Sequence, residues 1–476
     1  MAANVAGELI RPTVSVSDPA RVMRDVDEAR ARLIEFGRNE ALKSAAAVEI
    51  DAVTSFHRRP VRIEDFEHID FSQLLSRETV SSLAALTAHR LLLCVNDLET
   101  CSVGGALSAQ QARQRSVYSS EESRFRGALV RPFLEQFGFA HARVATQGAR
   151  SRGECEDEIH GWASQQRRFL EKLVSRLTRH RYLQEGMRFA LLQKWCLHRT
   201  KCTALQIAEA KGYLAGLAPA EWPRLSMNDE VGRELARAAE RAGVTRPEHS
   251  YWQFYLATSL AEANLLHALR RQPCTPLRLA GAAFLAELDA VVFCEALHTL
   301  VEATGDANRS VGAAVGALMA RVRRALETLD AQGGIAAVQE FASGWAMARV
   351  VSECAHADLD AQLSWISRVP EQLQIARQIL QRIHDERPAI DRESFTEPRE
   401  MCSTTHVHDD HRLVDIESGR MVFWANLGMR LRFDPGDVMF VPKHRLHGST
   451  VESDVCRYHQ PIIPQEWLTS FVGWRD

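Results

Sequence analysis

The chain contains 476 residues, more than a single hydrophobic core usually organises, so its length predicts about three domains. Its formal charge of −3, from 58 lysines and arginines against 61 aspartates and glutamates, gives no reason to expect nucleic acid or an anionic membrane as a partner. The ten cysteines form no Cys-x-x-Cys pair, which argues against a zinc ribbon or a dithiol redox motif and favours reduced thiols in a cytoplasmic protein.

Residues 1–150 are predicted to form a helical module. Residues 1–19 show no regular period and lack the basic and apolar blocks of a signal peptide. Helical spacing of apolar residues begins near Asp18, and a further helix is expected over residues 78–93. The histidines of this region stand alone, as structural histidines usually do. Because two helical layers do not bury their own apolar faces, we expect this module to support a homodimer rather than catalysis.

Residues 151–385 are predicted to form an all-α bundle, because helical periodicity continues without βαβ alternation or a glycine-rich phosphate loop. The longest apolar run, residues 281–297, contains Glu287, Asp289 and Glu295, which indicates a buried helix rather than a membrane span. The Gly333-Gly334 pair predicts a break between two helices. The later helices are expected over residues 250–269, 276–301, 313–329 and 335–364.

Residues 386–476 change to short apolar runs separated by turn residues, which is typical of an all-β domain. Asp434-Pro435-Gly436-Asp437 is a turn signal that precedes the apolar run Val438–Val441. The strands are expected over residues 421–425, 429–433, 438–441 and 455–458.

Three histidines of this last region are candidate metal ligands. His406 and His408 are two residues apart, so in an extended strand their imidazoles share one face. His447 follows the predicted strand 438–441, and it meets the other two if the two segments lie side by side in a small barrel. Three neutral imidazoles without a thiolate favour Fe(II), Mn(II), Zn or Cu, and three protein ligands leave coordination positions open for substrate or O2.

These motifs resemble those of cupins, whose first motif carries His-x-His and whose second carries Pro-Gly-Asp, a later Pro and a His. Arg412 stands where the first motif usually has a glutamate, and His444 stands where the second usually has a glycine. The first departure indicates a site of three histidines without a carboxylate, which weakens any interpretation as an oxalate-type or manganese enzyme. The alternative is that these are surface histidines on a β domain.

The order of helical module, helical bundle and C-terminal cupin resembles the iron-dependent enzymes that form the N-nitrosourea group of streptozotocin from an N-methylated arginine. The resemblance implies that the N-terminal part supports dimerisation. It implies a heme-oxygenase-like bundle whose diiron centre hydroxylates guanidino nitrogens. It also implies a cupin with one iron, held by three histidines, that rearranges the hydroxylated guanidine oxidatively and forms the N–N bond.

The diiron motif implied by this resemblance is degenerate in the sequence. Glu230, His249 and Glu287 are the candidate ligands that the chain retains, although a helix-terminal charge and a capping or core histidine are the structural alternatives. Because iron without its full set of ligands dissociates or stays hydrated, we expect the bundle to have lost its diiron chemistry. Other implied ligand positions carry residues that are not iron ligands: Gln193, Ser310, Ala314, Ala317 and, after His356 and Asp360, Leu363.

The leading hypothesis is a mononuclear non-heme iron oxygenase with one Fe(II) per chain held by His406, His408 and His447. The resemblance implies an N-hydroxylated arginine-like or other guanidino substrate, which another enzyme would supply if the bundle is inactive. Arg412 and His411 are candidates to bind a substrate carboxylate, with solvent exposure as the alternative for both. Tyr458 and His459 are candidates to line the cavity.

Three other interpretations stay open. A bifunctional enzyme would also N-hydroxylate its substrate at a diiron site in the bundle. A cupin dioxygenase or isomerase would act on an unrelated small acid. A non-catalytic protein would bind a small molecule or serve as a scaffold.

Overall fold

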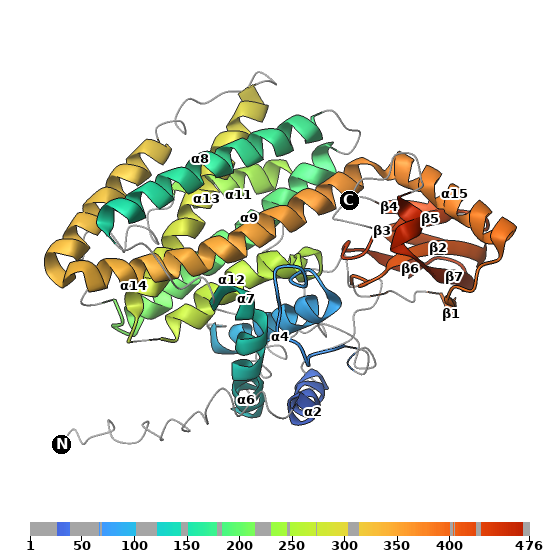
Figure 1. Cartoon of the computed structure of the whole chain (residues 1–476), viewed down its shortest axis with the longest axis horizontal. Helices are drawn as coiled ribbons and strands as arrows, with labels where there is room; N and C mark the ends of the chain where they lie inside the picture. Colours follow the sequence, from blue (N-terminus) through green and yellow to red (C-terminus); the bar gives the residue numbers. More distant parts are fainter. Residues whose placement is uncertain are drawn as a thin grey trace, which may run out of the picture.

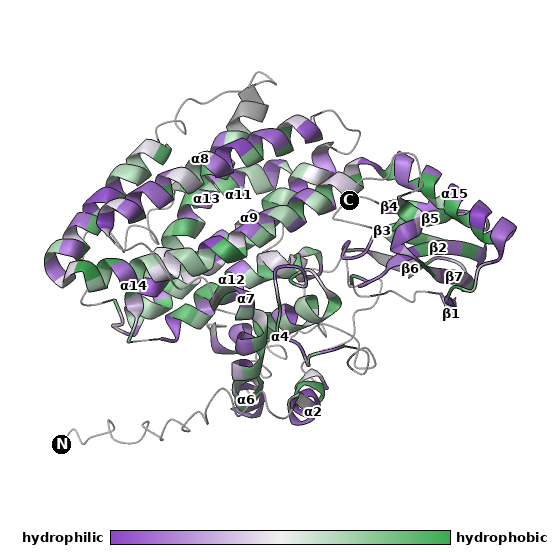
Figure 2. Cartoon of the chain, viewed as in Figure 1, coloured by the Kyte–Doolittle hydropathy of each residue, from purple (hydrophilic) through white to green (hydrophobic). Residues whose placement is uncertain are grey.

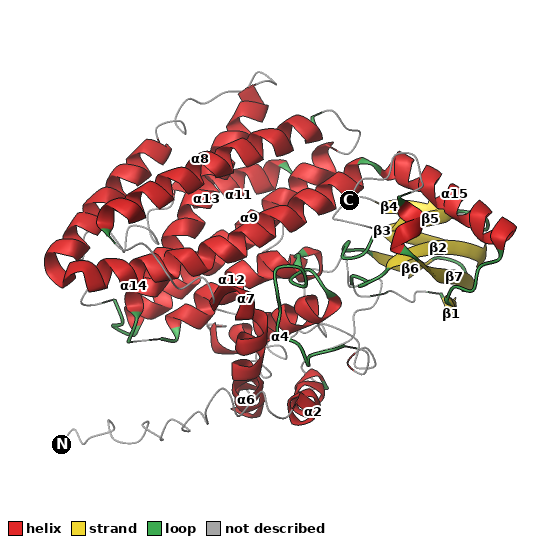
Figure 3. Cartoon of the chain, in the orientation of Figure 1, coloured by secondary structure: helices red, strands yellow, loops and turns green. Residues whose placement is uncertain are grey.

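The computed structural model is mainly helical, with an antiparallel, strand-rich region at the C-terminal end of the chain (Figures 1 and 3), so the predicted fold class is confirmed. The strands gather at one end of the molecule, beside the helix that precedes them (Figure 3). The structure describes residues 26–38, 66, 69–100, 121–143, 151–178, 183–214, 230–244, 248–272, 274–302, 314–399, 403, 405–424 and 430–469.

The N-terminal helices pack on the bundle as well as on each other. They are α2 (Val26–Gly37), α4 (Leu83–Thr100), α6 (Glu121–Gly138) and the short α7 (Ala140–Arg143). Phe71 meets Phe133 and Phe137 edge-on, with ring centroids 5.9 and 5.2 Å apart. The side chain of Asn96 on α4 bonds that of Asn264, inside the bundle, at 2.7 Å. The N-terminal helices therefore share one core with the bundle, and the predicted homodimer stays a prediction.

The bundle helices each turn an apolar face inward. Ser151 and Glu154 form a reciprocal capping box that starts the first of them, α8. Figure 2 shows hydrophilic and hydrophobic residues mixed along α8, as a half-buried helix requires, whereas every residue of the central α12 is buried. The helices are α8 (Arg152–Leu177), α9 (Leu183–Ala210), α11 (Glu230–Arg241), the 3-10 helix η2 (Glu248–Phe254), α12 (Ala257–Arg270), α13 (Pro276–Glu302) and α14 (Ala314–Ser367).

Two glycines allow α13 and α14 to approach closely. A Cβ atom on Gly281 would lie 2.1 Å from the carbonyl oxygen of Phe341, and one on Gly344 would lie 1.9 Å from that of Arg278. Gly334 interrupts α14 with φ 61° and ψ −163°, so the predicted break is confirmed, and α14 consists of two helical segments on either side of this kink. In the described residues, no helix is long and apolar enough to span a membrane, and the apolar run 281–297 lies in α13.

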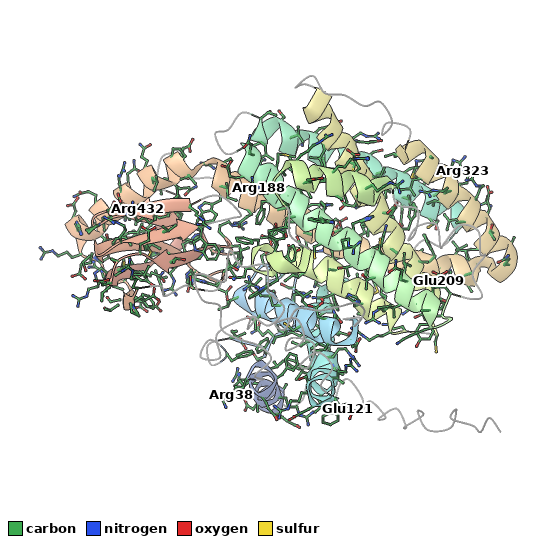
Figure 4. The ribbon with its side chains drawn as sticks, turned by 180° about the vertical axis from the view of Figure 1, so that it is seen from behind. Arg38, Glu121, Arg188, Glu209, Arg323 and Arg432 are labelled. Carbon is green, nitrogen blue, oxygen red and sulfur yellow. The ribbon has the colours of Figure 1, made fainter. Side chains whose placement is uncertain are left out.

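The bundle is also tied together at its edge. Arg188, labelled in Figure 4, donates from Nε to the carbonyl of Ala242 at 2.6 Å, which joins α9 to the end of α11. Arg432, labelled at the left end of the molecule in the same view, belongs to the strand-rich region and pairs with Glu452 at 3.2 Å.

The strand-rich region contains two antiparallel sheets, ordered β1-β7-β2-β5 and β4-β3-β6. Helix α15 (Val369–Glu386) covers the first sheet, and its isoleucines share a small apolar core with Leu413 and Phe440. The apolar run 438–441 is a strand as predicted, while the predicted strand 455–458 extends to Ile463. The strands are β1 (Arg392–Pro398), β2 (His411–Ser418), β3 (Met421–Trp424), β4 (Arg430–Phe433), β5 (Val438–Val441), β6 (Gly448–Val451) and β7 (Val455–Ile463), followed by the short helix α16 (Gln465–Leu468).

Candidate metal centre

Backbone pairing brings the three predicted histidines together. The amide of His406 donates to the carbonyl of His447 at 2.9 Å, and the amide of His447 donates back at 3.1 Å, which forms an isolated antiparallel bridge. The amide of His444 donates to the carbonyl of His408 at 2.8 Å, so the pairing continues one step further. The segment before β2 and the segment before β6 are thus held edge to edge, and their histidines share one face.

The three imidazole rings converge closely. Their centroids are 4.8 Å apart for His406 and His408, 4.5 Å for His406 and His447, and 5.0 Å for His408 and His447. The Nδ1 atom of His447 donates to the carbonyl of Arg445 at 2.8 Å, which leaves the lone pair of its Nε2 available. Within the described part of the chain, the buried Nε2 atoms of His408 and His447 have no hydrogen-bond partner.

Electrostatics keep two of these rings neutral. Burial lowers the pKa of both His408 and His447 well below the ordinary histidine value, and the neighbouring His406 lowers both further. Neutral imidazoles with free Nε2 lone pairs are what a first-row divalent ion requires as ligands. The residues therefore fit a metal ion held by three histidines.

Two turns with left-handed residues shape the segment that carries the third histidine. Gly436 has φ +88°, and the amide of Asp437 donates to the carbonyl of Asp434 at 3.0 Å, which closes the predicted Asp-Pro-Gly-Asp turn. His444 has φ 62°, a left-handed conformation that glycine adopts more easily than a residue with a side chain. Its Nε2 lies 3.5 Å from Oδ1 of Asp409, so the side chain is held beside the His406–His408 segment.

The triad opens on a cavity of about 580 Å³. Its charged lining residues are Arg90, Glu393, Glu397 and Arg412. The remaining lining is largely apolar, which suits a small organic ligand with a few charged groups. It comprises Leu83, Leu86, Ser394, Phe395, Ser403, Thr405, Val407, Val414, Met421, Phe423, Ser449, Tyr458 and Gln460.

Helix α4 of the N-terminal module forms one wall of this cavity, contrary to the expectation that residues 1–150 only support association. Leu83, Leu86 and Arg90 are among the lining residues. Asp409, which follows the second ligand of the His-x-His motif, accepts a bond from the amide of Leu83 at 2.9 Å and so caps the helix. The contact joins residues 326 positions apart, and no local pattern in the sequence signals it.

Arg412 lies inside the cavity wall. Its side chain pairs with Glu393 of β1, and the residue is only 9% exposed, so the alternative of solvent exposure is wrong. Within the residues that the structure describes, its buried Nε has no hydrogen-bond partner. The guanidinium therefore lies in the cavity wall, beside the carboxylate of Glu393.

The other three candidates divide between the two faces of their strands. Tyr458 is 5% exposed, stacks on Phe395 with ring centroids 5.2 Å apart, and lines the cavity as predicted. His459, the next residue of β7, is not a lining residue; it bonds Ser394 at 2.8 Å and lies 3.4 Å from Glu417. Successive strand residues point to opposite faces, which corrects the prediction for His459.

His411 is likewise directed away from the cavity. Its Nε2 bonds the side chain of Gln465 at 2.7 Å, and its Nδ1 accepts a bond from the amide of Lys443 at 3.2 Å. Its ring stacks on Phe440. His411 therefore supports the layer beneath α16, and the prediction that it faces the ligand is wrong.

The bundle holds the two ligand-bearing segments from outside. On the His447 side, the side-chain amide of Gln362 in α14 both donates to the carbonyl of Leu446 at 2.8 Å and accepts from its amide at 3.0 Å. On the His406 side, Thr405 bonds Gln253 of η2, and the Arg90 guanidinium donates to the carbonyl of Thr405 and, at 3.2 Å, to that of Gln253. The metal centre is thus fixed to the helices rather than to the sheets alone.

The chain is similar in sequence to a known protein over most of its length. No known protein-family profile matches it. Nitrosourea synthase of Streptomyces achromogenes subsp. streptozoticus is 28% identical over 428 residues, which cover 84% of this chain and 88% of that protein. This chain is a relative of nitrosourea synthase. The match extends far beyond the strand-rich region, so it includes helices of the bundle as well.

In this relative of nitrosourea synthase, the bundle contains a second group of possible metal ligands. Among the described residues, two groups of three such side chains have ligand atoms within 4.8 Å of one another. One is the histidine triad, and the other is Glu262, Asp289 and His356, all buried. The sequence analysis did not find this group, because its members lie on three different helices.

Two further polar residues are directed at this second group. Lys194 Nζ lies 2.6 Å from Oδ2 of Asp289 and 2.8 Å from Nε2 of His356. Gln166 Nε2 donates to Oδ1 of Asp289 at 2.8 Å and approaches Nε2 of His356 at 2.7 Å. Polar groups of the chain itself therefore already surround the ligand atoms of Asp289 and His356, whose Nε2 and Oδ1 atoms lie 3.1 Å apart.

The pKa shifts agree with this arrangement. Burial lowers the pKa of His356 to about 4, and the Lys194 ammonium contributes, so the ring is neutral at neutral pH. Burial alone would raise the pKa of Asp289, but Lys194 and His356 outweigh it and hold the pKa below its usual value. Burial raises the pKa of Glu262 to about 8. A protonated Glu262 with an ionised Asp289 and a charged Lys194 makes the cluster neutral overall.

Of the three diiron candidates, the structure describes only the side chain of Glu287. Glu287 pairs with the buried Lys201 and lies 3.9 Å from His198, so its charge is already balanced within the bundle. Glu230 begins α11 and His249 lies in η2, but the structure does not describe their side chains.

Three of the positions at which the sequence lacks an implied iron ligand have side chains that the structure describes. Gln193 bonds the backbone of Phe254 and Leu256, at 2.8 and 3.1 Å, and is a structural residue. Leu363 is fully buried in the core, and Ala317 is exposed on α14. Ser310 lies outside the described residues. The described residues of the bundle do not fit a diiron centre.

Proposed function

We propose that this chain is a mononuclear non-heme iron enzyme that uses O2 to rearrange an N-hydroxylated arginine-like or other guanidino substrate in natural-product biosynthesis, with N–N bond formation as the expected outcome. One observation carries the proposal: the unpartnered Nε2 atoms of His408 and His447 meet His406 at the wall of a cavity of substrate size. The name of its relative, nitrosourea synthase, supports the same chemistry.

One Fe(II) per chain would be held by the three histidines, and when bound it would supply the activation of O2 and substrate. The chain's own residues prepare the ligand geometry. The bond from His447 Nδ1 to the carbonyl of Arg445 fixes the tautomer that presents Nε2. Leu83 and Leu86 of α4 narrow the access of water to the triad, which favours a reaction in a dry site.

The charges of the cavity suit a substrate that carries both a carboxylate and a guanidinium group. Arg412 offers a planar fork for the carboxylate, and Glu393 and Glu397 on β1 offer acceptors for the guanidinium. The ion pair between Arg412 and Glu393 shows that groups of these charges meet within the same wall. A zwitterionic substrate would replace that internal pair by two external ones, and Tyr458 would flank it.

A direct assay tests the proposal. The protein is loaded anaerobically with Fe(II), and O2 consumption is measured with N-hydroxylated arginines and, for comparison, with simple keto acids and amino acids. We expect consumption with the N-hydroxylated arginines and a product whose mass and fragmentation show an N–N bond. Consumption with simple acids alone would favour an unrelated cupin dioxygenase. No turnover with any of them, together with iron binding that survives His447→Ala, would contradict the proposal.

The bundle's internal lysines lead us to propose that the substrate arrives already N-hydroxylated, from another enzyme. Feeding the non-hydroxylated guanidine to the Fe(II)-loaded protein is the matching control, and we expect no product from it. Formation of the hydroxylated intermediate would instead support the bifunctional interpretation. The homodimer and the cytoplasmic location belong to this proposal as well, and light scattering of the purified chain tests the first of them.

A further inference from the structure

The centre of the bundle contains five buried polar side chains, each from a different helix. Gln166 comes from α8, Lys194 from α9, Glu262 from α12, Asp289 from α13 and His356 from α14. The ligand atoms of the last three lie within 4.8 Å of one another, as the ligands of a single metal ion would. A carboxylate pair with one imidazole is a donor set that suits Mn(II), Fe(II), Co(II) or Zn.

A cation already lies among these ligands, and it belongs to the chain. The Lys194 ammonium contacts Oδ2 of Asp289 at 2.6 Å and Nε2 of His356 at 2.8 Å, and the residue is only 2% exposed. These are the two atoms that would bind a metal ion most strongly. An ammonium group and a divalent ion repel each other and compete for the same lone pairs, so both do not fit in this cluster.

We propose that Lys194 is a built-in cation that excludes metal from the bundle, and that its removal converts Glu262, Asp289 and His356 into a site for one divalent first-row ion. The proposal does not depend on the function proposed for the barrel. It follows from the contacts of one side chain: a buried aspartate at 0% exposure needs a counter-charge, and Lys194 supplies it at present. Without the lysine, a metal ion is the counter-charge for which the remaining ligands are arranged.

Lys201 offers a matched control on the same helix. It is a fully buried lysine that pairs with the buried Glu287, so its removal also strands a carboxylate. Besides Glu287, its surroundings include His198 at 3.9 Å from that carboxylate, and this neighbourhood does not form one of the groups of three ligands found among the described residues. Two ligands hold a metal ion much more weakly than three or four. Lys201→Ala should therefore be destabilised in the same way without gaining a metal site.

The experiment uses the full chain with the barrel triad removed by His406→Ala and His447→Ala, so that any bound ion belongs to the bundle. Co(II) is the probe, because its visible absorption reports coordination and its amount is measured after desalting. We expect almost no Co(II) in this background and about one ion per chain after Lys194→Ala is added. Lys194→Glu, which adds a carboxylate ligand from α9, should bind Co(II) more tightly and unfold at a higher temperature when Co(II) is present.

Four outcomes would overturn the proposal. One is Co(II) bound in the background with Lys194 intact and lost on His356→Ala, because the lysine would then not exclude metal. A second is the absence of Co(II) binding in both folded Lys194 variants. A third is equal binding in Lys201→Ala. A fourth is failure of both Lys194 variants to fold even when refolded with Co(II), because a metal site would have supplied the missing charge. In the supporting result, adding His356→Ala to Lys194→Ala abolishes the new Co(II) absorption.

Discussion

The strand-rich region and the helical bundle each bring three possible metal-ligand side chains together, but the chemical groups that face those side chains differ. In the barrel, Nε2 of His408 and Nε2 of His447 are buried and face a cavity without a donor among the described residues. In the bundle, the corresponding lone pairs of Asp289 and His356 face the Lys194 ammonium and the Gln166 amide. The count of possible ligands is the same, but the second group already has a cationic side chain in contact with its ligand atoms.

A metal site is thus defined by the charges around its ligands as well as by the types of ligand. In the triad, burial lowers the pKa of His408 and His447, so these two rings are neutral and need no counter-charge. The bundle cluster contains one buried carboxylate of low pKa, and a lysine already balances it. One buried lysine is therefore enough to balance the ionised carboxylate among these possible ligands.

The largest effect is expected when a histidine of the triad in the strand-rich region is replaced. His447→Ala removes one of three ligands, so we expect loss of stoichiometric iron and no detectable turnover, with only a minor change in thermal stability. Iron analysis and O2 consumption measure the two effects. His459→Ala is the matched control, because this histidine of the same region faces away from the cavity. Equal losses in both variants would mean that the triad is not the metal centre.

Removing Lys194 from the bundle should lower stability and leave turnover unchanged. Removing one partner of a buried ion pair costs about 3–5 kcal/mol, and Lys194→Ala strands Asp289, which is 0% exposed. We therefore expect a loss of that size in the free energy of unfolding, measured by urea denaturation without metal. Double replacement by Lys194→Met and Asp289→Asn should recover part of it, since no net charge is then left buried. A loss below about 1 kcal/mol in Lys194→Ala would show that the pair is not desolvated.

The sequence predicted the triad because local spacing determines it: His406 and His408 share a face by the period of two, and the Asp434–Asp437 turn places His447. The same period also contained a signal that was missed. Tyr458 and His459 are adjacent in a strand, as are His411 and Arg412, so only one of each pair faces the cavity. In both cases the structure places the non-histidine partner there.

Other features depend on contacts between distant parts of the chain and leave no local signal. The cap on α4 joins Leu83 to Asp409, and the bundle cluster joins Gln166 to His356. Lys194 illustrates the difficulty most clearly. A lysine within an apolar helical pattern suggests a solvent-facing position, and nothing near it in sequence reveals that Asp289, 95 positions later, will balance its charge inside the core.

A smaller effect is expected when a bundle residue that supports the backbone beside His447 is replaced. Gln362→Ala removes both bonds to the backbone of Leu446, the residue before His447, while it touches neither the metal ligands nor the cavity. Loosening a support of a ligand typically weakens metal affinity about tenfold, so we expect a change of that order in the Fe(II) dissociation constant. Gln381→Ala on the exposed face of α15 is the matched control. Unchanged iron affinity in Gln362→Ala would mean that the sheets alone position His447.

The smallest predicted effect concerns the proton that the bundle cluster holds. Burial raises the pKa of Glu262 from 4.5 to about 8, so between these values the folded chain binds a proton that the unfolded chain has released. Stability must therefore fall as the pH rises through that window.

The neutral His356, whose pKa is lowered to about 4, acts in the opposite direction, but its contribution changes mainly below pH 6.5. Between pH 6.5 and 8 the Glu262 contribution therefore dominates the cluster, at about 2 kcal/mol at most. Urea denaturation of the wild type and of Glu262→Gln at the two pH values isolates it. The variant should lose this part of the pH dependence, and parallel curves for the two proteins would show that Glu262 is ionised in the folded bundle and that Lys194 balances two carboxylates rather than one.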